Sequence, residues 1–307
     1  MRTANSRRPL ARLVDQLERV SRVDLVLLLT VLTLLLYHNN VWYLSGPLTA
    51  VMVAGLVWAP MRTSALYWLV TLMLVTAAGL VTWYAIDNHQ HLFIYWCLAV
   101  CLALRLGPED RDPCLAQSAS LLLGTAMLLA AVQKLLSPSY LSGAFFQYTL
   151  LTDARFESLA WAFGHLSLAQ LKDNRALASA LTDGSVTSPG ASAVTLIVTE
   201  QVRRLARLMT WFTFVMEGIL AVLFLVPRAG ARRAVVRSVV LVVFLIAVYP
   251  AAPVIGFAWI LITMGLAQLP VGHPTLRAML VGLFVLLPIV TVSPARVWTT
   301  VGRILGP

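Results

Sequence analysis

Two charged residues stand in long apolar stretches of this sequence and are its leading candidates for chemistry. Lys134 ends the apolar segment 115–136, and Glu217 lies within the segment 206–226. A charge in apolar surroundings is costly unless it is paired or used. A desolvated lysine can release its proton and act as a base, which arginine cannot do. Only two of the 23 basic residues are lysines. Because arginine is the usual basic residue in this chain, a lysine at position 134 suggests a role that arginine could not fill.

Both residues also have interpretations without chemistry. Lys134 is close enough to a helix end for its ammonium to extend to water. Glu217 lies about ten residues from either end of its segment, or ~15 Å deep at about 1.5 Å per residue, so it must be protonated, paired or beside a polar cavity. A direct Lys134–Glu217 pair would satisfy both groups. Their depths match poorly, however, unless the apolar segment begins later than residue 206.

A third group of polar residues opens the apolar segment 89–106. Asp87, Asn88 and His89 offer hydrogen-bond donors and acceptors, and a histidine can titrate near neutral pH. His89 and His91 are two residues apart and would point in different directions on a helix, so we expect no metal site. Simple capping of the helix that follows is the alternative interpretation.

The elements that position these residues are predicted to be membrane-spanning helices. The chain is 59% hydrophobic and 12% charged, about half the charge of a soluble domain, and its mean hydropathy is +0.82. Apolar runs longer than about 17 residues can cross a bilayer, and lipid requires them to be helical. We therefore predict an all-α polytopic integral membrane protein, a bundle of about nine transmembrane helices with an extracytoplasmic loop carrying interfacial helices. The predicted spans are 23–43, 47–60, 64–85, 89–106, 115–136, 206–226, 236–250, 254–269 and 276–293.

The distribution of arginine predicts the orientation of these spans. Residues 1–22 contain six arginines, and Arg228, Arg232, Arg233 and Arg237 are expected to form one basic loop. Such clusters mark cytoplasmic segments, so the net charge of +10 indicates topology and contacts with membrane lipids rather than nucleic acid. We expect a protein of the cell (inner) membrane with a cytoplasmic N-terminus that acts as an uncleaved anchor. The bundle is predicted to occupy 23–293, followed by a short tail, 294–307.

The long connection between residues 137 and 205 is predicted to lie outside the cell. Apolar residues recur at near-helical spacing from Phe156 to Leu171, which predicts an interfacial helix. Turn residues follow at 183–190, and a second helix carries Glu200 and three arginines. Long loops are often functional, so a lid over an outer cavity is plausible.

Part of this pattern resembles the vitamin K-dependent γ-glutamyl carboxylases and the wider horizontally transferred transmembrane (HTTM) family of bacterial proteins. Asp87-Asn88-His89 at the start of an apolar helix is similar to the Asn-Asn-His segment of the carboxylases. The resemblance extends over residues 20–292, and the block 83–150 is its specific part.

The lysine segment carries the second part of the resemblance. Residues 131–134, followed by Tyr140, Gly143 and an aromatic pair at 145–146, resemble the segment that holds the carboxylases' catalytic lysine. Glu217 and the basic loop after its helix resemble an acidic residue and loop of the same family.

The resemblance implies a quinol as cofactor and a base mechanism. In the carboxylases, a lysine deprotonates vitamin K hydroquinone in an apolar pocket on the lumenal side. Oxygen then yields a strong base that removes a γ-proton from a substrate glutamate, to which carbon dioxide adds. By this resemblance Lys134 and His89 are the expected catalytic residues. The expected ligand-binding residues are Asp87, Asn88, Gln133, Tyr140 and Glu217.

Three departures from the carboxylase pattern argue against carboxylation of peptide glutamates. The sequence ends at Pro307, so we expect the large lumenal substrate region to be absent. Gln133 stands where the carboxylases have a second lysine, and residues 244–253 lack their histidine. The alternative is a non-enzymatic membrane partner, or a maturation subunit for a secreted peptide, acting with a partner membrane or periplasmic protein. A transporter is the third possibility, disfavoured because the chain shows no repeated halves.

Overall fold

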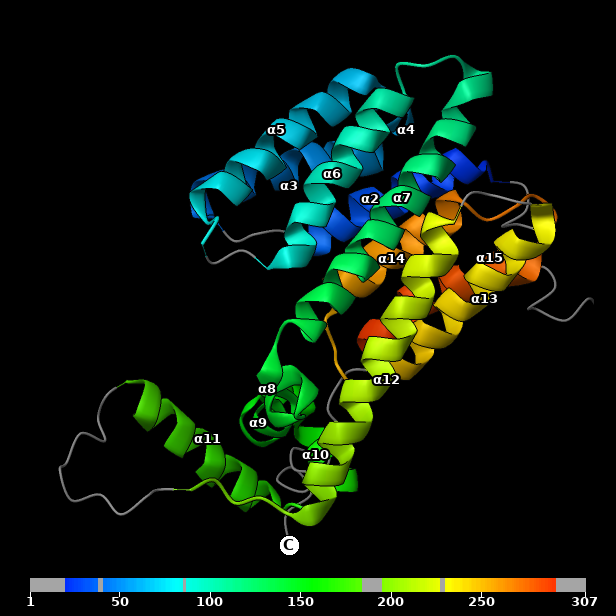
Figure 1. Cartoon of the computed structure of the whole chain (residues 1–307). Coiled ribbons are helices and arrows are strands. Elements are labelled where there is room, and N and C mark those ends of the chain that lie inside the picture. The colour runs from blue at the N-terminus through cyan, green and yellow to red at the C-terminus, as the bar shows by residue number, and fades with distance from the viewer. Residues whose placement is uncertain (1–19, 38–40, 85–86, 184–194, 227–229, 291–307) are drawn as a thin grey trace, which may run out of the picture. The chain divides into compact units, whose positions relative to one another are not determined.

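The computed structural model describes residues 20–37, 41–84, 87–183, 195–226 and 230–290 (Figure 1). Every regular element within these ranges is a helix, which confirms the all-α prediction. The arginines before residue 20, Arg228, the predicted turn residues 184–190 and the tail 294–307 lie outside them.

Each predicted span overlaps one long helix, with ends that differ by several residues, and the span predicted at 47–60 also reaches the short helix α4 (Ala59–Arg62). Two of these helices, α7 and α12, are long and apolar enough to cross a membrane, and four others are shorter apolar helices. Helix lengths alone therefore support two candidate spans, and a nine-span bundle stays a prediction. The helices are α2 (Arg22–Leu36), α3 (Trp42–Val57), α5 (Ala65–Val81), α6 (Asn88–Ala103), α7 (Pro108–Leu135), α12 (Glu200–Leu225), α13 (Gly230–Val248), α14 (Ile255–Ala267) and α15 (Pro274–Val290).

The chain divides into two compact units. Unit 1 comprises residues 1–127, 220–246 and 254–286. Within it, α5 packs along α6, and α2 packs against α3 and α14 (Figure 1). The Trp96 indole N–H donates to Thr30 Oγ1 at 3.0 Å, so this fully buried side chain places no unsatisfied donor in the apolar core.

Three arginines assigned to the predicted basic loop lie instead on helix α13 of unit 1, and one of them is buried. Helix α13 begins at Gly230, so Arg237 is helical and only 3% exposed. Its Nη1 donates to Ser120 Oγ at 3.3 Å, and its guanidinium lies 5.7 Å from the centre of the Phe224 ring. The loop prediction is therefore wrong for Arg232, Arg233 and Arg237, because the helix that carries the apolar run starts before all three.

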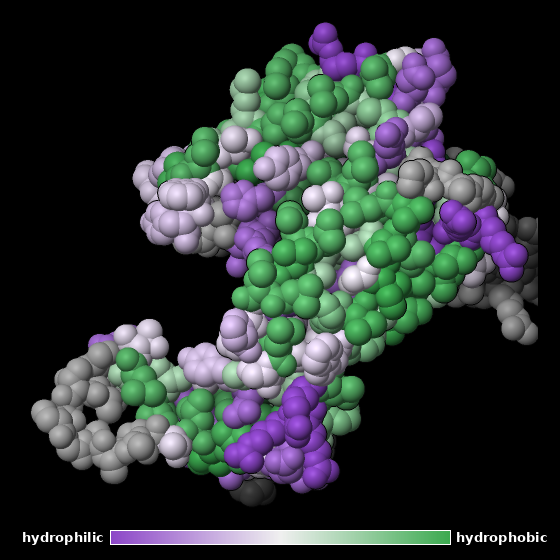
Figure 2. All heavy atoms as spheres, in the orientation of Figure 1, coloured by the Kyte–Doolittle hydropathy of each residue, from purple (hydrophilic) through white to green (hydrophobic). Residues whose placement is uncertain are grey.

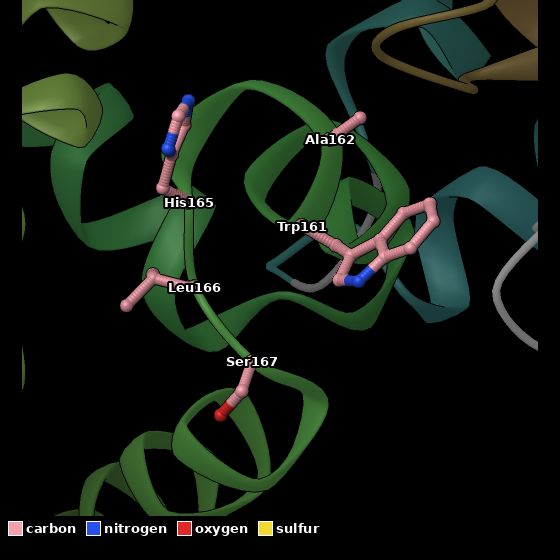
Figure 3. A pocket seen from close by; sticks show the side chains of 5 residues that line it. All are labelled: Trp161, Ala162, His165, Leu166 and Ser167. Carbon is pink, nitrogen blue, oxygen red and sulfur yellow. The ribbon is translucent and has the colours of Figure 1, made fainter.

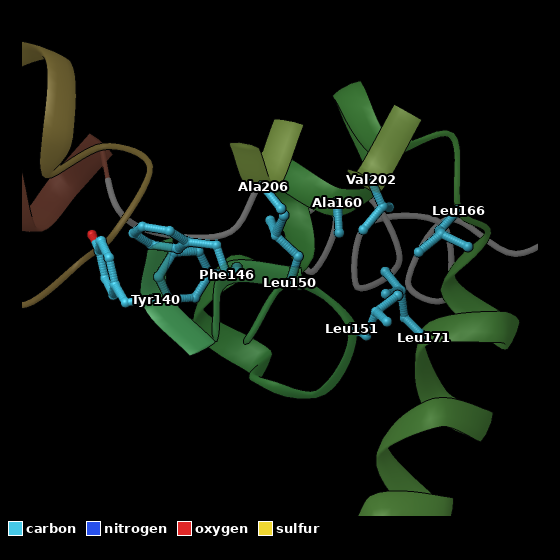
Figure 4. Packing of buried hydrophobic residues seen from close by; sticks show 10 residues of the cluster. Tyr140, Phe146, Leu150, Leu151, Ala160, Leu166, Leu171, Val202 and Ala206 are labelled. Atoms are coloured by element: carbon cyan, nitrogen blue, oxygen red, sulfur yellow. The ribbon is translucent and has the colours of Figure 1, made fainter. Parts of the chain in front are cut away.

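Unit 2 comprises residues 128–219, 247–253 and 287–307, and its described part folds around its own small core. Four short helical elements, α8 (Pro138–Leu141), α9 (Ala144–Thr152), η1 (Ala154–Phe156) and α10 (Glu157–Gly164), lead to α11 (Leu168–Thr182). Figure 4 shows the apolar side chains that they and α12 contribute. The core residues are Tyr140, Phe146, Leu150, Leu151, Phe156, Ala160, Leu166, Leu171, Val202 and Ala206.

The continuous interfacial helix predicted from Phe156 to Leu171 is wrong. The chain turns at His165, which adopts a left-handed conformation with φ 54°. Ser167 then starts α11, accepting from the Gln170 backbone N–H while the Gln170 side chain accepts from the Ser167 N–H. The apolar spacing reflects two helices that share one core.

The helix predicted to carry Glu200 and three arginines is confirmed, and it is continuous with the span predicted at 206–226. These residues form the first turns of α12, a continuous helix of 26 residues. Val202 and Ala206 on this part of α12 belong to the unit 2 core. The first ten residues of α12 thus pack in the unit 2 core, and the apolar part of the helix follows them.

Candidate functional site

Lys134 and Glu217 form a direct ion pair in unit 2. The Lys134 ammonium, in the last turn of α7, donates to Glu217 Oε1 on α12. The two side chains are 17% and 11% exposed, so water screens the pair weakly. The sequence allowed this pair only if the apolar part of the helix begins later than residue 206, and the first turns of α12 do pack in the unit 2 core.

Tyr140 completes this cluster from α8. The Lys134 Nζ lies 5.1 Å from the centre of the Tyr140 ring, a cation–π contact. The Tyr140 hydroxyl lies 2.5 Å from Thr213 Oγ1, and that oxygen also lies 2.7 Å from the Met209 carbonyl. Either hydroxyl can be the donor between Tyr140 and Thr213. Burial raises the pKa of Tyr140 above its ordinary value, and the hydrogen bond with Thr213 opposes the shift.

Sequence reasoning did not identify Thr213 as part of the cluster. It lies four residues before Glu217, so both side chains are on the same face of α12. That spacing is a signal in the sequence, because it places the threonine hydroxyl on the helix face that carries the buried acid.

One oxygen of Glu217 has no hydrogen-bond partner among the described residues. Its Oε2 is buried, while Oε1 accepts from Lys134. An unsatisfied buried acceptor costs about 1–3 kcal/mol, so a ligand that donates a hydrogen bond there would recover that free energy. Tyr249, also in unit 2 and buried, interacts electrostatically with the same carboxylate. The cluster thus combines a cation, a phenol and a buried carboxylate oxygen that has no hydrogen-bond partner among the described residues.

His89 belongs to a second group, in unit 1. Its Nε2 lies 3.0 Å from the Tyr37 hydroxyl and 3.9 Å from Asp87 Oδ2. Its ring centre lies 6.4 Å from that of Phe93 and 5.9 Å from that of Phe257. With a side chain only 10% exposed, His89 is held firmly among aromatic residues.

The remaining predicted ligand-binding residues are exposed. Asp87 precedes α6 but makes no side-chain cap hydrogen bond, so it does not cap the helix as the alternative interpretation required. Asn88 is the first residue of α6, and Gln133 is next to Lys134; both are exposed. The structure thus joins Lys134, Tyr140 and Glu217, and places Asp87, Asn88 and His89 at the start of α6. The catalytic role that the resemblance implies for Lys134 and His89 stays a prediction.

A shallow, open depression lies elsewhere on unit 2, where α10 gives way to α11. It is lined by Trp161, Ala162, His165, Leu166 and Ser167 (Figure 3). None of the predicted site residues lines it. No group of three or more histidine, cysteine or acidic residues in the described ranges is arranged to hold a metal ion.

No protein-family model, curated protein or solved structure matches this chain. The likeness to the carboxylases therefore rests on the residues quoted above.

Proposed function

We propose that the chain is a multi-pass protein of the cell membrane that binds a quinol or another lipophilic ligand at the cluster of Lys134, Tyr140 and Glu217. Its N-terminus is cytoplasmic and the region from 137 to 205 is extracytoplasmic. The observation that carries the ligand proposal is the buried, unpartnered Oε2 of Glu217 beside a paired lysine.

The exposed apolar surface supports the membrane assignment. Figure 2 shows hydrophobic side chains covering much of the visible surface of the long helices. On α12 they recur every three or four residues along one face, so this face is a continuous apolar stripe. Such a surface is unfavourable in water and suited to lipid. The exposed residues of the stripe are Leu208, Trp211, Val215, Ile219 and Val222.

The polar groups of the cluster suit a quinol. A quinol hydroxyl can donate to Glu217 Oε2, and a quinol oxygen can accept from the Lys134 ammonium. The aromatic ring of Tyr140 provides an adjacent apolar wall. A lysine acts as a base only when neutral, so base chemistry requires that Lys134 first pass its proton to Glu217 or another acceptor. The resemblance implies that chemistry, with oxygen as co-substrate.

A non-enzymatic role is the second candidate, and the ion pair itself favours it. The ammonium of Lys134 is already matched by Glu217, and the pair connects the end of α7 to α12. In that role the pair organises helices that bind a secreted peptide or a partner membrane protein.

A native mass spectrum of the purified full-length protein with its co-purified lipids tests the ligand proposal. We expect an adduct with the mass of a quinone on the wild type, and its loss from Lys134→Ala and Glu217→Gln. Lys172→Ala is the matched control, because it removes the other lysine from the exposed face of α11. Absence of any quinone adduct, or its retention in Lys134→Ala, contradicts quinol binding at this cluster and leaves the non-enzymatic role.

A further inference from the structure

Unit 1 contains a separate pocket, with a volume of about 530 Å³, that includes no residue of the proposed ligand site. It opens between the start of α2, the first turns of α7, and the connection from α14 to α15. Pockets that hold small ligands have volumes of about 300–1,000 Å³. Its ionisable lining residues are Arg22, Asp112, His273 and Arg277.

Hydrogen bonds fix both arginines at the wall of this pocket. Arg22 Nη1 donates to the Leu269 carbonyl at 2.8 Å, and its Nη2 donates to Asp112 Oδ2 at 2.6 Å. Arg277 Nη2 donates to the Val20 carbonyl at 2.7 Å. A guanidinium has five N–H groups, and these two bonds leave Arg22 with donors to spare for a ligand. The arginines are therefore pre-positioned rather than extended into solvent.

The electrostatics of the pocket favour an anion. The pocket lining carries two guanidinium groups and one carboxylate, that of Asp112. Helix α15, 17 residues long, begins at Pro274 in the pocket lining, so the positive end of its dipole adds to the same field. The fork of an arginine matches phosphate oxygens in geometry as well as in charge.

We infer that this pocket binds a phosphate group, carried either by the headgroup of an anionic lipid or by a soluble phosphate ester. The arginine bias of the sequence puts this end of unit 1 on the cytoplasmic side, where anionic headgroups and soluble phosphates are both available. The site differs from a diffuse basic surface, because it requires Arg22 and Arg277 rather than the exposed arginines of α13.

The binding test uses purified full-length protein in a neutral detergent. Phosphatidylglycerol, phosphatidylcholine and inorganic phosphate are titrated separately, and bound ligand is counted by native mass spectrometry or by the shift in unfolding temperature. We expect phosphatidylglycerol to bind more tightly than phosphatidylcholine. Arg277→Gln is expected to weaken that binding on the order of tenfold, the effect of losing one charge-assisted contact. Arg232→Gln, at an exposed position on α13, is the matched control and should leave it unchanged.

Asp112→Asn provides a test with the opposite sign. It removes the competing carboxylate, so phosphatidylglycerol should bind more tightly even if Arg277→Gln folds poorly. Inorganic phosphate that displaces the lipid from the wild type assigns the site to any phosphate group, whereas failure to displace it assigns the site to the lipid headgroup. The inference would be overturned if Arg277→Gln and Arg232→Gln weakened binding equally, or if Asp112→Asn bound phosphatidylglycerol more weakly than the wild type. It would also be overturned if the protein showed no preference for phosphatidylglycerol and did not bind inorganic phosphate.

Discussion

At the scale of single residues, the chemistry of the cluster depends on how Lys134 and Glu217 restrain each other. Each charge is costly without the other in this weakly hydrated position. Glu217 Oε2 is buried and has no hydrogen-bond partner within the part of the chain that the structure describes. The two residues were identifiable from the sequence because both charges interrupt apolar runs. Their pairing was one of the alternatives that the sequence left open, because it depends on where the apolar part of the helix around Glu217 begins.

The ion pair should appear as a coupling free energy. Removing either partner alone leaves one buried charge unmatched, so Lys134→Met and Glu217→Gln should each lower the free energy of unfolding by about 1.5–3 kcal/mol. The double variant should lose less than the sum of the two, with a coupling of at least about 1 kcal/mol. Unfolding of the four proteins in the same detergent measures this. Additive losses would mean that the two groups do not interact.

Reversing the charge at position 217 is a more severe test of the same ion pair. Glu217→Lys places two ammonium groups together with no carboxylate between them, so it should be much less stable than Glu217→Gln and should insert or fold poorly. Expression yield and the unfolding temperature in detergent provide the comparison. If Glu217→Lys is as stable as the wild type, residue 217 faces water and the cluster is not as described.

Tyr140 predicts a pH dependence at alkaline pH. Its folded-state pKa is raised by burial, so the neutral phenol stabilises the fold fully below the unfolded pKa of about 10 and progressively less as pH rises above it. Between about pH 9 and pH 11, the wild type should lose more stability than Tyr140→Phe. Tyr148→Phe, at an exposed position on α9, is the control and should behave like the wild type. A wild-type curve parallel to that of Tyr140→Phe would contradict the burial of this phenol.

At the scale of elements, long apolar runs predicted the positions of the helices well, because burial or lipid stabilises such runs in almost any context. The short elements between 137 and 205 were harder to predict. At the break, His165 adopts the left-handed conformation although it is not glycine. No local signal in the sequence predicts that conformation at a histidine. The polar first turns of α12 resembled a separate surface helix, because their apolar residues face a core that forms only after the chain folds back.

The α10–α11 turn makes a paired prediction at this scale. Ser167→Ala removes the N-cap of α11 and should destabilise unit 2 by about 1 kcal/mol. His165→Gly relieves the left-handed strain and should stabilise it by up to about 1 kcal/mol. Opposite shifts in unfolding temperature are expected, and shifts of the same sign would contradict the turn geometry.

At the scale of the whole molecule, the central claim is that α12 crosses the membrane and carries Glu217 to Lys134 within it. Composition and the exposed apolar stripe on α12 support this crossing. The crossings made by the other helices are predicted from their apolar runs and from the distribution of arginine. If α12 does not cross, the sidedness of both proposed sites fails with it.

Cysteine labelling on either side of α12 tests that claim most directly. In a variant with Cys97, Cys101 and Cys114 replaced by serine, single cysteines are introduced as Lys172→Cys on α11 and Arg232→Cys on α13, both exposed positions. The account predicts that a membrane-impermeant maleimide labels the cysteine at 172 in intact cells, and the cysteine at 232 only after permeabilisation. Labelling of both cysteines in intact cells, or of neither, would show that α12 does not cross the membrane, and the reverse pattern would invert the assigned orientation.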